Sequence, residues 1–313
     1  MTRHRQMLPQ LDGPLFLTDG GIETTLIFHK GIDLPEFATF VLLDDDDGCA
    51  ALAEYYRTYL DIAAASKSGF VLETPTWRAN RDWGAKLGYD RERLAGVNRR
   101  AVDFLEHLRE DYAGNEQPIV ISGNIGPRGD GYVAGEKMTA GEAAAYHRDQ
   151  VSVFAETSAD LVTAMTMTYP EEAVGIVRSA NEHGMPSVIG FTTETDGRLP
   201  DGTTLEAAIA RVDQEADGGP AYYMVNCAHT EHFAGALNDS AAWAQRIRAV
   251  RANASRLSHA ELDAAEELDD GDPLEFGALH RTLRERLPRL NVFGGCCGTD
   301  HRHIRHVQQA LYV

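Results

Sequence analysis

Short apolar runs alternate with longer segments of helical periodicity along almost the whole chain. Eight runs rich in β-branched residues predict strands over 15–19, 69–76, 118–123, 160–166, 186–192, 221–227, 248–252 and 290–294. Apolar residues three and four apart predict helices over 49–67, 91–110, 140–158, 171–184, 203–217, 239–247, 275–287 and 300–311. Buried strands joined by crossover helices form parallel sheets, and eight such units favour a closed (β/α)₈ TIM barrel of the α/β class.

An open, doubly wound sheet is the rival architecture for this alternation. That fold usually carries a Gly-x-Gly-x-x-Gly turn after its first strand, whereas here the first run ends in Asp19-Gly20-Gly21. The barrel is therefore the better prediction. No linker divides the chain, because the least patterned stretch, 264–272, lies between the seventh strand and the helix before the eighth. We expect one domain over residues 1–313.

Composition argues against several classes of protein. The formal net charge of −19 and the lack of a basic stripe with interleaved aromatic residues argue against nucleic acid and anionic membranes as partners. No run approaches the roughly 18 apolar residues of a membrane span, and no apolar signal segment follows the basic start. We expect a cytoplasmic protein. Its four cysteines lack the spacing of a secreted disulfide framework, so we expect reduced thiols.

Three of the four cysteines fall where predicted strands end. Cys227 closes the sixth run, while Cys296 and Cys297 follow the eighth, with Gly294 and Gly295 before them and Gly298 after them. Chemistry in a barrel collects at the C-terminal ends of its strands, so we expect these cysteines to converge. Three thiolates hold zinc and leave a fourth position for a substrate sulfur, which would lose its proton on the metal. Zn²⁺ is the predicted cofactor; the alternatives are buried cysteines without a ligand and a vicinal Cys296–Cys297 redox disulfide.

The cysteine segment also resembles a known family. Gly294 to Asp300, with His303-Ile304 after it, is similar to the C-terminal signature of the zinc-dependent homocysteine S-methyltransferases, which include betaine and S-methylmethionine enzymes. Weaker similarities follow the family's order: Asp19-Gly20-Gly21, Thr76 to Asn80, Gly126-Pro127, Asp196 to Leu199 with Gly202, Val225 to Ala228, and Ala252 to Ala254. The adjacent cysteines are the specific part of this resemblance.

The resemblance implies a (β/α)₈ barrel whose zinc ligands are Cys227, Cys296 and Cys297. The implied reaction moves a methyl group from a sulfonium or quaternary-amine donor to a zinc-bound thiolate, homocysteine or a related thiol, as in methionine biosynthesis. The expected partners are therefore a small-molecule thiol acceptor and a methyl donor. No catalytic side chain is implied beyond the zinc-bound substrate thiolate. The family's substrate positions fall on Asp19, Gly20, Gly21, Thr76, Met165 and Asn226.

Three of these expectations have alternatives. Asp19 matches a turn cap as well as a substrate contact, and Thr76 matches a loop hydrogen bond equally well. A vicinal-dithiol redox protein, or a zinc-binding protein without methyl transfer, is the alternative function. The sequence selects neither the methyl donor nor the oligomeric state.

One position departs from the family. After the fourth strand the family presents a Glu that binds the amino group of homocysteine, and this chain has Met165 there. A buried ammonium without a partner is costly, so we hypothesise that the acceptor is another thiol, or homocysteine held differently. Three acids near predicted strand ends are candidate replacements: Glu23, Glu73 and Glu194. Local misalignment is the other interpretation, although the nearby Glu171 and Glu172 match the first turn of a helix.

Further polar residues near the predicted strand ends are weaker candidates. His229 and His232 follow Cys227 and are candidates for a base or for contacts behind the metal ligands. The glycine-rich run 126–131 predicts a long loop over the barrel mouth, with Arg128 as a candidate contact for an anionic substrate. Three histidines interleave with arginines on the last predicted helix, which indicates surface display: His301, His303 and His306.

Overall fold

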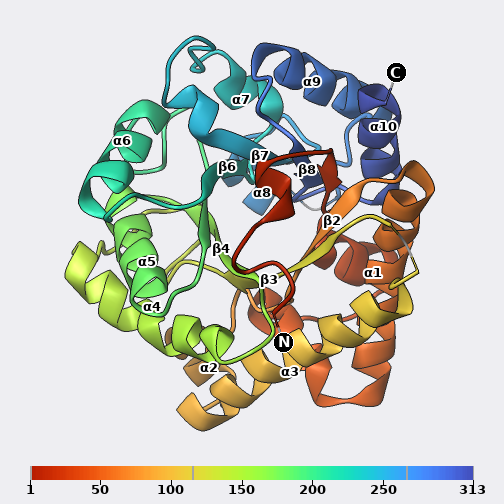
Figure 1. Cartoon of the computed structure of the whole chain (residues 1–313), viewed down its shortest axis with the longest axis vertical. Helices are drawn as coiled ribbons and strands as arrows, with labels where there is room; N and C mark the ends of the chain where they lie inside the picture. Colours follow the sequence, from red (N-terminus) through yellow and green to blue (C-terminus); the bar gives the residue numbers. More distant parts are fainter. Residues whose placement is uncertain (1, 115, 266, 313) are drawn as a thin grey trace.

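The chain closes into a barrel of eight parallel strands ringed by helices (Figure 1). The computed structural model describes residues 2–114, 116–265 and 267–312. Strands follow one another around the barrel in sequence order, and pairing of Phe16 with Val292 closes it. The strands are β1 (Phe16–Leu17), β2 (Gly69–Glu73), β3 (Ile119–Ile125), β4 (Leu161–Met167), β5 (Ser187–Phe191), β6 (Tyr222–Asn226), β7 (Ile247–Ala252) and β8 (Val292–Gly295). The predicted α/β barrel is confirmed, and the open sheet is excluded.

The helices are α1 (Asp46–Ser66), α2 (Arg81–Lys86), α3 (Arg91–Asp111), α4 (Ala140–Ala155), α5 (Pro170–Glu182), α6 (Leu205–Glu215), α7 (Thr230–Ala234), α8 (His259–Asp263), α9 (Pro273–Arg286) and α10 (His301–Leu311). Seven of them correspond to predicted helices. Side-chain caps mark several starts, since Asp45, Asp90 and Thr139 each accept a backbone N–H from the first turn. Within the described residues, no helix combines the length and apolarity that crossing a membrane requires.

The helix predicted over 239–247 is wrong. Residues 244–246 form only a 3₁₀ turn, and the crossover after β6 contains the five-residue α7 instead. Polar side chains before that turn make local bonds that compete with a helix, because the Ser240 hydroxyl donates to Asn238 Oδ1 at 3.0 Å. The short helices α2 and α8 escaped prediction because one or two turns carry too little periodicity.

Alternate residues of the strands face the barrel interior. The layer nearest the strand starts is an apolar cluster that includes Phe16, Val71, Val120, Leu161, Val188, Tyr222, Ala249 and Val292. Two residues further along their strands, buried polar and charged side chains replace it, among them Thr18, Glu73, Thr163 and Arg251. The interior therefore has a packed apolar floor and a polar upper layer, which places reactive groups at the C-terminal ends of the strands.

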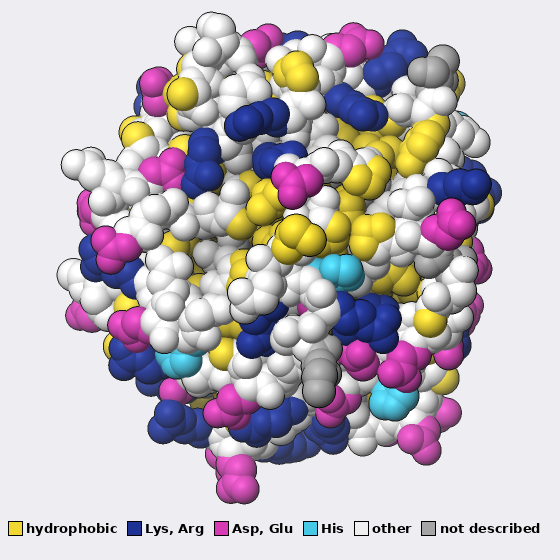
Figure 2. All heavy atoms as spheres, in the orientation of Figure 1, with side chains coloured by type: hydrophobic (Ala, Val, Ile, Leu, Met, Phe, Trp, Pro, Cys, Tyr) yellow, Lys and Arg dark blue, Asp and Glu magenta, His cyan; other side chains and the backbone are white. Residues whose placement is uncertain are grey.

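Residues 3–11 cover the opposite, N-terminal end of the barrel (Figure 1, dark red). Leu8 packs into the interior apolar cluster, and the backbone N–H groups of Arg3 and His4 donate to Asp160 Oδ1 at 3.0 and 2.8 Å. The Arg5 guanidinium donates to carbonyls at the end of α4, among them Ala155 O at 2.9 Å. Figure 2 shows this face, with hydrophobic side chains gathered near its middle. The chain's own N-terminal segment thus closes one end of the barrel.

Candidate functional site

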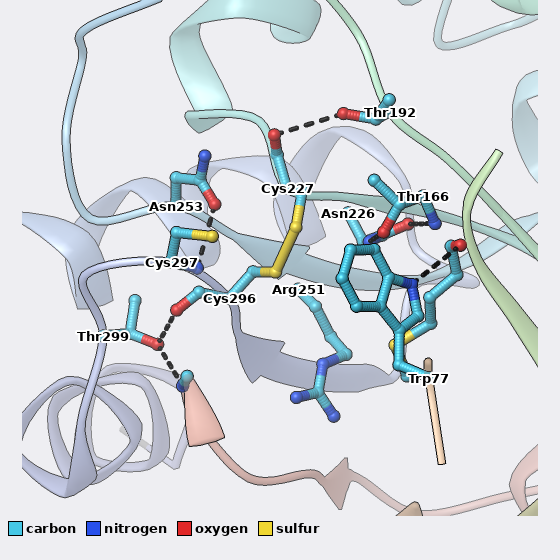
Figure 3. Close-up of a disulfide and its surroundings, with 12 residues drawn as sticks. Trp77, Thr166, Thr192, Asn226, Cys227, Arg251, Asn253, Cys296, Cys297 and Thr299 are labelled. Atoms are coloured by element: carbon cyan, nitrogen blue, oxygen red, sulfur yellow. Dashed lines mark hydrogen bonds between the residues drawn. A yellow bond between two sulfur atoms is a disulfide. The ribbon is translucent and has the colours of Figure 1, made fainter. Parts of the chain in front are cut away.

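Three cysteine sulfurs meet at the C-terminal end of the barrel (Figure 3). Cys227 directly follows β6, and Cys296 and Cys297 directly follow β8; their Sγ atoms all lie within 4.8 Å of one another. The adjacent pair is held by its backbone, because Cys296 N donates to Ala252 O at 2.8 Å and Cys297 N donates to Asn253 Oδ1 at 3.1 Å. The expected convergence of the cysteines is therefore present.

Cys227 and Cys296 are joined as a disulfide, and Cys297 is a free thiol. The structure thus pairs Cys227 with Cys296, and not the vicinal Cys296 with Cys297. Strands β6 and β8 bring the Cα atoms of Cys227 and Cys296 to 5.4 Å, an ordinary separation for a disulfide. The Cys297 sulfur instead lies 2.9 Å from the hydroxyl of Tyr132. Once the pair is reduced, the site offers three thiols at a spacing that suits one thiophilic metal ion.

The Cys297 thiol has partners that the sequence did not reveal. Burial raises the pKa of this thiol to about 11, so without a metal it carries its proton at neutral pH. The Tyr132 ring stacks on His259 with ring centroids 4.3 Å apart, and His259 Nε2 donates to the carbonyl oxygen of Cys227 at 2.7 Å. Tyr132 belongs to the long loop that the sequence predicts over the mouth, but no local pattern marks it or His259 as a neighbour of the cysteines.

Asp19 is buried and fully engaged within the protein. One carboxylate oxygen pairs with the Arg251 guanidinium, and the other accepts the Tyr55 hydroxyl at 2.8 Å. Arg251 also donates to Gly20 O at 3.1 Å. Although burial opposes its charge, the carboxylates of Asp19 and Glu73 hold the pKa of Arg251 above its ordinary value. In Figure 3, Arg251 projects below the Cys227–Cys296 pair. A buried ion pair therefore lies beneath the cysteines, and sequence reasoning missed its cation.

The neighbouring glycines serve close packing. Gly21 N donates to Thr299 Oγ1 at 3.0 Å, and a Cβ added at Gly21 would meet Cys296 O at 2.5 Å. A Cβ at Gly20 would meet the Tyr59 hydroxyl at 2.8 Å. Only glycine lets the turn after β1 lie this close to the cysteine turn after β8.

Thr76 and Asn226 use their side chains to hold other segments. The Thr76 hydroxyl donates to Asn124 O at 2.7 Å, which corresponds to the loop hydrogen bond considered for it. Asn226 Oδ1 accepts Thr166 N at 3.0 Å, and Asn226 Nδ2 donates to Thr166 Oγ1 at 3.1 Å. Thr166 and Cys227 both have left-handed backbones, with φ of 64° and 53°. Such conformations are uncommon outside glycine and concentrate at functional sites, and here the Asn226 amide holds one of them.

Met165 lies inside the barrel and is 6% exposed. It packs with the interior apolar cluster and with Trp77, whose indole N–H reaches Met165 O at 3.4 Å. Of the three candidate replacement acids, Glu73 faces the interior, and burial raises its pKa to about 7. Burial also raises the pKa of Glu23, which accepts the Thr39 hydroxyl at 2.8 Å. Glu194 lies 3.4 Å from His259 Nδ1.

The remaining candidate residues serve structural contacts. His229 Nδ1 caps α7, and burial lowers its pKa to about 4, while His232 Nε2 donates to Arg256 O at 2.9 Å. Arg128 pairs with Asp82 at 2.9 Å rather than standing free. Glu171 and Glu172 begin α5 as expected.

Surface display of the last-helix histidines is wrong for His303. Its exposure is 0%, and its Nε2 donates to Asp270 O at 2.8 Å. His303 shares the inner face of α10 with Ile304 and Val307 and lies against Phe276 of α9. Helical spacing alone did not separate this inward position from the exposed His301.

Fold and site together define a class: a (β/α)₈ barrel whose C-terminal strand ends present a cysteine cluster able to hold a metal. The model of the homocysteine S-methyltransferase family matches residues 16–311, and the chain belongs to this family. It is therefore a methyltransferase.

Individual relatives agree with the family match. The homocysteine S-methyltransferase YbgG of Bacillus subtilis is 23% identical over 312 residues, which cover 94% of this chain and 93% of that protein. The metallated form of the homocysteine methyltransferase MmuM from Escherichia coli superposes with a TM-score of 0.70 at 18% identity, covering 95% and 96% of the two chains. Its oxidized form gives 0.72 with the same identity and coverage. At this identity, the structural likeness concerns the fold.

Proposed function

We propose that this methyltransferase moves a methyl group to a thiol whose sulfur binds a zinc ion held by Cys227, Cys296 and Cys297. The observation that carries the proposal is the meeting of these three sulfurs within 4.8 Å at the ends of β6 and β8. Three soft sulfur donors with no fourth cysteine beside them suit zinc with one open position. Bound zinc would supply the Lewis acidity that keeps a substrate thiol deprotonated at neutral pH.

Methyl transfer then requires little more than correct alignment of the thiol sulfur with the methyl donor. The acceptor sulfur forms a bond to the methyl carbon as the donor's bond to that carbon breaks, and the donor leaves with the electron pair as a neutral sulfide or amine. The thiol proton passes to solvent. A cationic donor supplies the leaving group, so the protein contributes alignment of the two substrates rather than a general acid. A sulfonium and a quaternary amine both satisfy this requirement.

Homocysteine or a related thiol is the proposed acceptor. The names of YbgG and MmuM support homocysteine, and the apolar Met165 at the family's Glu position supports a change in how the acceptor is held. Asp19 supports the same change, because Arg251 and Tyr55 already use its oxygens. Comparing homocysteine with 4-mercaptobutanoate, which lacks the amine, tests this point: a strong preference for homocysteine would contradict an altered acceptor.

A dithiol redox role is the second candidate function, favoured by the Cys227–Cys296 disulfide. In that role the pair would exchange two electrons with another thiol and move no methyl group. Both functions use the same sulfurs, so metal content and methyl transfer distinguish them.

The deciding experiment measures zinc in protein purified under reducing conditions. We expect about one zinc per chain, lost in Cys227→Ser, Cys296→Ser and Cys297→Ser together with thiol methylation. Cys49→Ser is the matched control, because Cys49 is the free cysteine on α1, away from the cluster. Metal-free protein that cycles between dithiol and disulfide without methylating any thiol would replace the proposal with the redox function.

Three further expectations belong to this proposal. We assign the activity to one domain spanning residues 1–313, with the small-molecule thiol and methyl donor as partners. We place the protein in the cytoplasm, where a reducing environment keeps the cysteine pair available to metal. Methionine biosynthesis is the corresponding role if homocysteine is the acceptor.

A further inference from the structure

Arg78 is a buried cation without a carboxylate partner. It follows β2, is 7% exposed, and its guanidinium lies between two indoles, 4.0 Å from the ring centre of Trp77 and 3.7 Å from that of Trp83. Arg78 Nη1 donates to Gly129 O at 3.2 Å, whereas the buried Nε–H has no hydrogen-bond partner. The stacked rings hold the guanidinium in a fixed plane.

Among the described residues, Arg78 lacks the acidic partner that the other deeply buried arginines have. Within the described residues, three arginines are buried, and two of them have acidic partners: Arg109 with Asp160 at 2.8 Å, and Arg251 with Asp19. Arg78 takes part in no ion pair among those residues. Burying a charge is costly unless it is paired, so an unpaired guanidinium in a family of enzymes indicates an anion that arrives with a substrate.

Arg78 borders the cysteine site through two neighbours. Trp77 and Thr166 both lie against Gly131, since a Cβ added there would meet Trp77 Cζ2 at 2.9 Å and Thr166 Cγ2 at 3.2 Å, and Figure 3 draws both among the residues around the Cys227–Cys296 pair. Gly129, which accepts from Arg78, belongs to the loop that also places the Tyr132 hydroxyl at the Cys297 sulfur. Arg78 and the Cys297 sulfur therefore contact the same loop.

The surrounding charges favour a singly charged anion. Burial lowers the pKa of Arg78 to about 10, while Asp130 and Glu23 oppose this shift, so the side chain is cationic at neutral pH. The same acidic neighbours would repel a doubly charged phosphate more strongly than a carboxylate. A planar carboxylate also matches the planar donor fork of a guanidinium.

We infer that Arg78 is a specificity-determining residue that binds the carboxylate of a substrate. The inference rests on the proposed methyl transfer and adds to it the anion-recognising group. The carboxylate belongs either to the thiol acceptor or to the methyl donor, and the assays below separate the two sources.

The test compares substrates with and without a carboxylate in Arg78→Gln and Arg78→Lys. The acceptors are homocysteine and 3-aminopropane-1-thiol, and the donors are S-methylmethionine and trimethylsulfonium. We expect Arg78→Gln to raise KM about 10- to 100-fold for the carboxylate-bearing partner, with kcat much less affected, and Arg78→Lys to give a smaller rise. The substrate lacking its carboxylate should show the same KM in all forms.

Arg93→Gln is the matched control. Arg93 also stacks on an aromatic ring, that of Tyr89 at 3.8 Å, but lies on α3 outside the site, so its KM values should equal those of the wild type. An equal loss for substrates with and without a carboxylate would overturn the inference, as would no loss in Arg78→Gln. Thermal unfolding of each variant identifies any loss that comes from misfolding.

Tryptophan fluorescence gives a readout that needs no turnover, since Arg78 lies between two of the three tryptophans. We expect a saturable change with methionine or S-methylmethionine in the wild type and Arg93→Gln, and none in Arg78→Gln or with 3-(methylthio)propylamine. The same change in Arg78→Gln would overturn the inference. If no thiol is methylated but this fluorescence pattern holds, the proposed function fails and the carboxylate site stands.

Discussion

The charge inside the barrel depends on a few buried ionisable residues, among them Glu73, whose pKa is shifted by its surroundings. Glu73 lies in the polar layer above the apolar floor, 6% exposed, and its Oε2 atom has no hydrogen-bond partner. Burial raises its pKa to about 7, even though the nearby Arg251 favours the charged form. Asp19, in contrast, is paired with that same arginine. Of these two acids, only Asp19 forms the ion pair with Arg251, whereas burial dominates at Glu73 and favours its protonated form.

Glu73→Gln should remove a pH dependence of stability. Between the unfolded pKa of about 4.5 and the folded value of about 7, the folded protein keeps a proton that the unfolded chain has lost. Wild-type stability should therefore fall as pH rises through this window, by up to about 3 kcal/mol relative to Glu73→Gln. Urea unfolding of both proteins from pH 5 to 8 measures the difference.

Glu285→Gln, which changes an acid that is 70% exposed in its side chain, is the control and should parallel the wild type. A constant difference between wild type and Glu73→Gln across the pH range would contradict the raised pKa.

At this scale the sequence predicted the cysteines but not their surroundings. Cys227, Cys296 and Cys297 end recognisable strands, so the barrel topology alone brings them together. Tyr132 and Arg78 lie in loops, whose paths depend on long-range contacts such as the bonds to Gly129 O. Single-sequence patterns carry no information about such contacts.

The turns after β1 and β8 form one packed unit at the level of elements. Gly21 N donates to Thr299 O and Thr299 Oγ1, and Gly298 N donates to Thr24 Oγ1 at 3.0 Å. These contacts join segments from the two ends of the chain next to the cysteines. The position of the turn that carries Cys296 and Cys297 therefore depends on the turn after β1 as much as on β8.

Gly21→Ala should disturb the cysteine cluster. The added methyl would meet Cys296 O at 2.5 Å and Thr24 Oγ1 at 2.8 Å, so the cysteine turn must move. We expect a loss of about 1–3 kcal/mol of stability and weaker zinc retention, measured by unfolding and by competition with a chelator.

Gly96→Ala is the matched control on α3, where nothing lies within 4 Å of the added methyl. It should stabilise the protein by about 0.4–1 kcal/mol and leave zinc retention unchanged. Equal behaviour of the two variants would show that the turns are not coupled.

Helices and strands could be predicted where the apolar residues kept a regular spacing over a long enough segment. All eight strands and seven helices appear close to their predicted ranges, whereas α7 and α8 have only five residues each. The stretch 239–247 had helical spacing of apolar residues, but local side-chain bonds and the Asp239–Arg286 ion pair hold it in turns. Tertiary context decided that segment.

For the whole molecule, Asp160 ties the N-terminal segment to the barrel. Its exposure is 0%, and it accepts bonds from Arg3 N, His4 N, Ile121 N and the Arg109 guanidinium. One carboxylate thus joins the N-terminal segment, β3, β4 and α3.

Asp160→Asn should destabilise the whole fold while sparing the cysteine site. An amide accepts through one oxygen only and presents N–H groups to donors, leaving the Arg109 charge unpaired, so we expect a loss of about 3–5 kcal/mol in chemical unfolding. Asp149→Asn, at an exposed pair with Arg91, should cost less than about 1 kcal/mol. Zinc content per folded chain should match the wild type in both variants. A loss of zinc in still-folded Asp160→Asn would contradict the separation of scaffold and site.

The segment 3–11 packs below the apolar floor and adds to the closure of the N-terminal end of the barrel. For the proposed transfer, both substrates must therefore reach the cysteines from the C-terminal end of the strands. We expect the thiol to bind before the methyl donor, and its methylated product to leave after the spent donor. Closure of the N-terminal end thus makes an ordered reaction, with both substrates entering from one side, the expected kinetic behaviour.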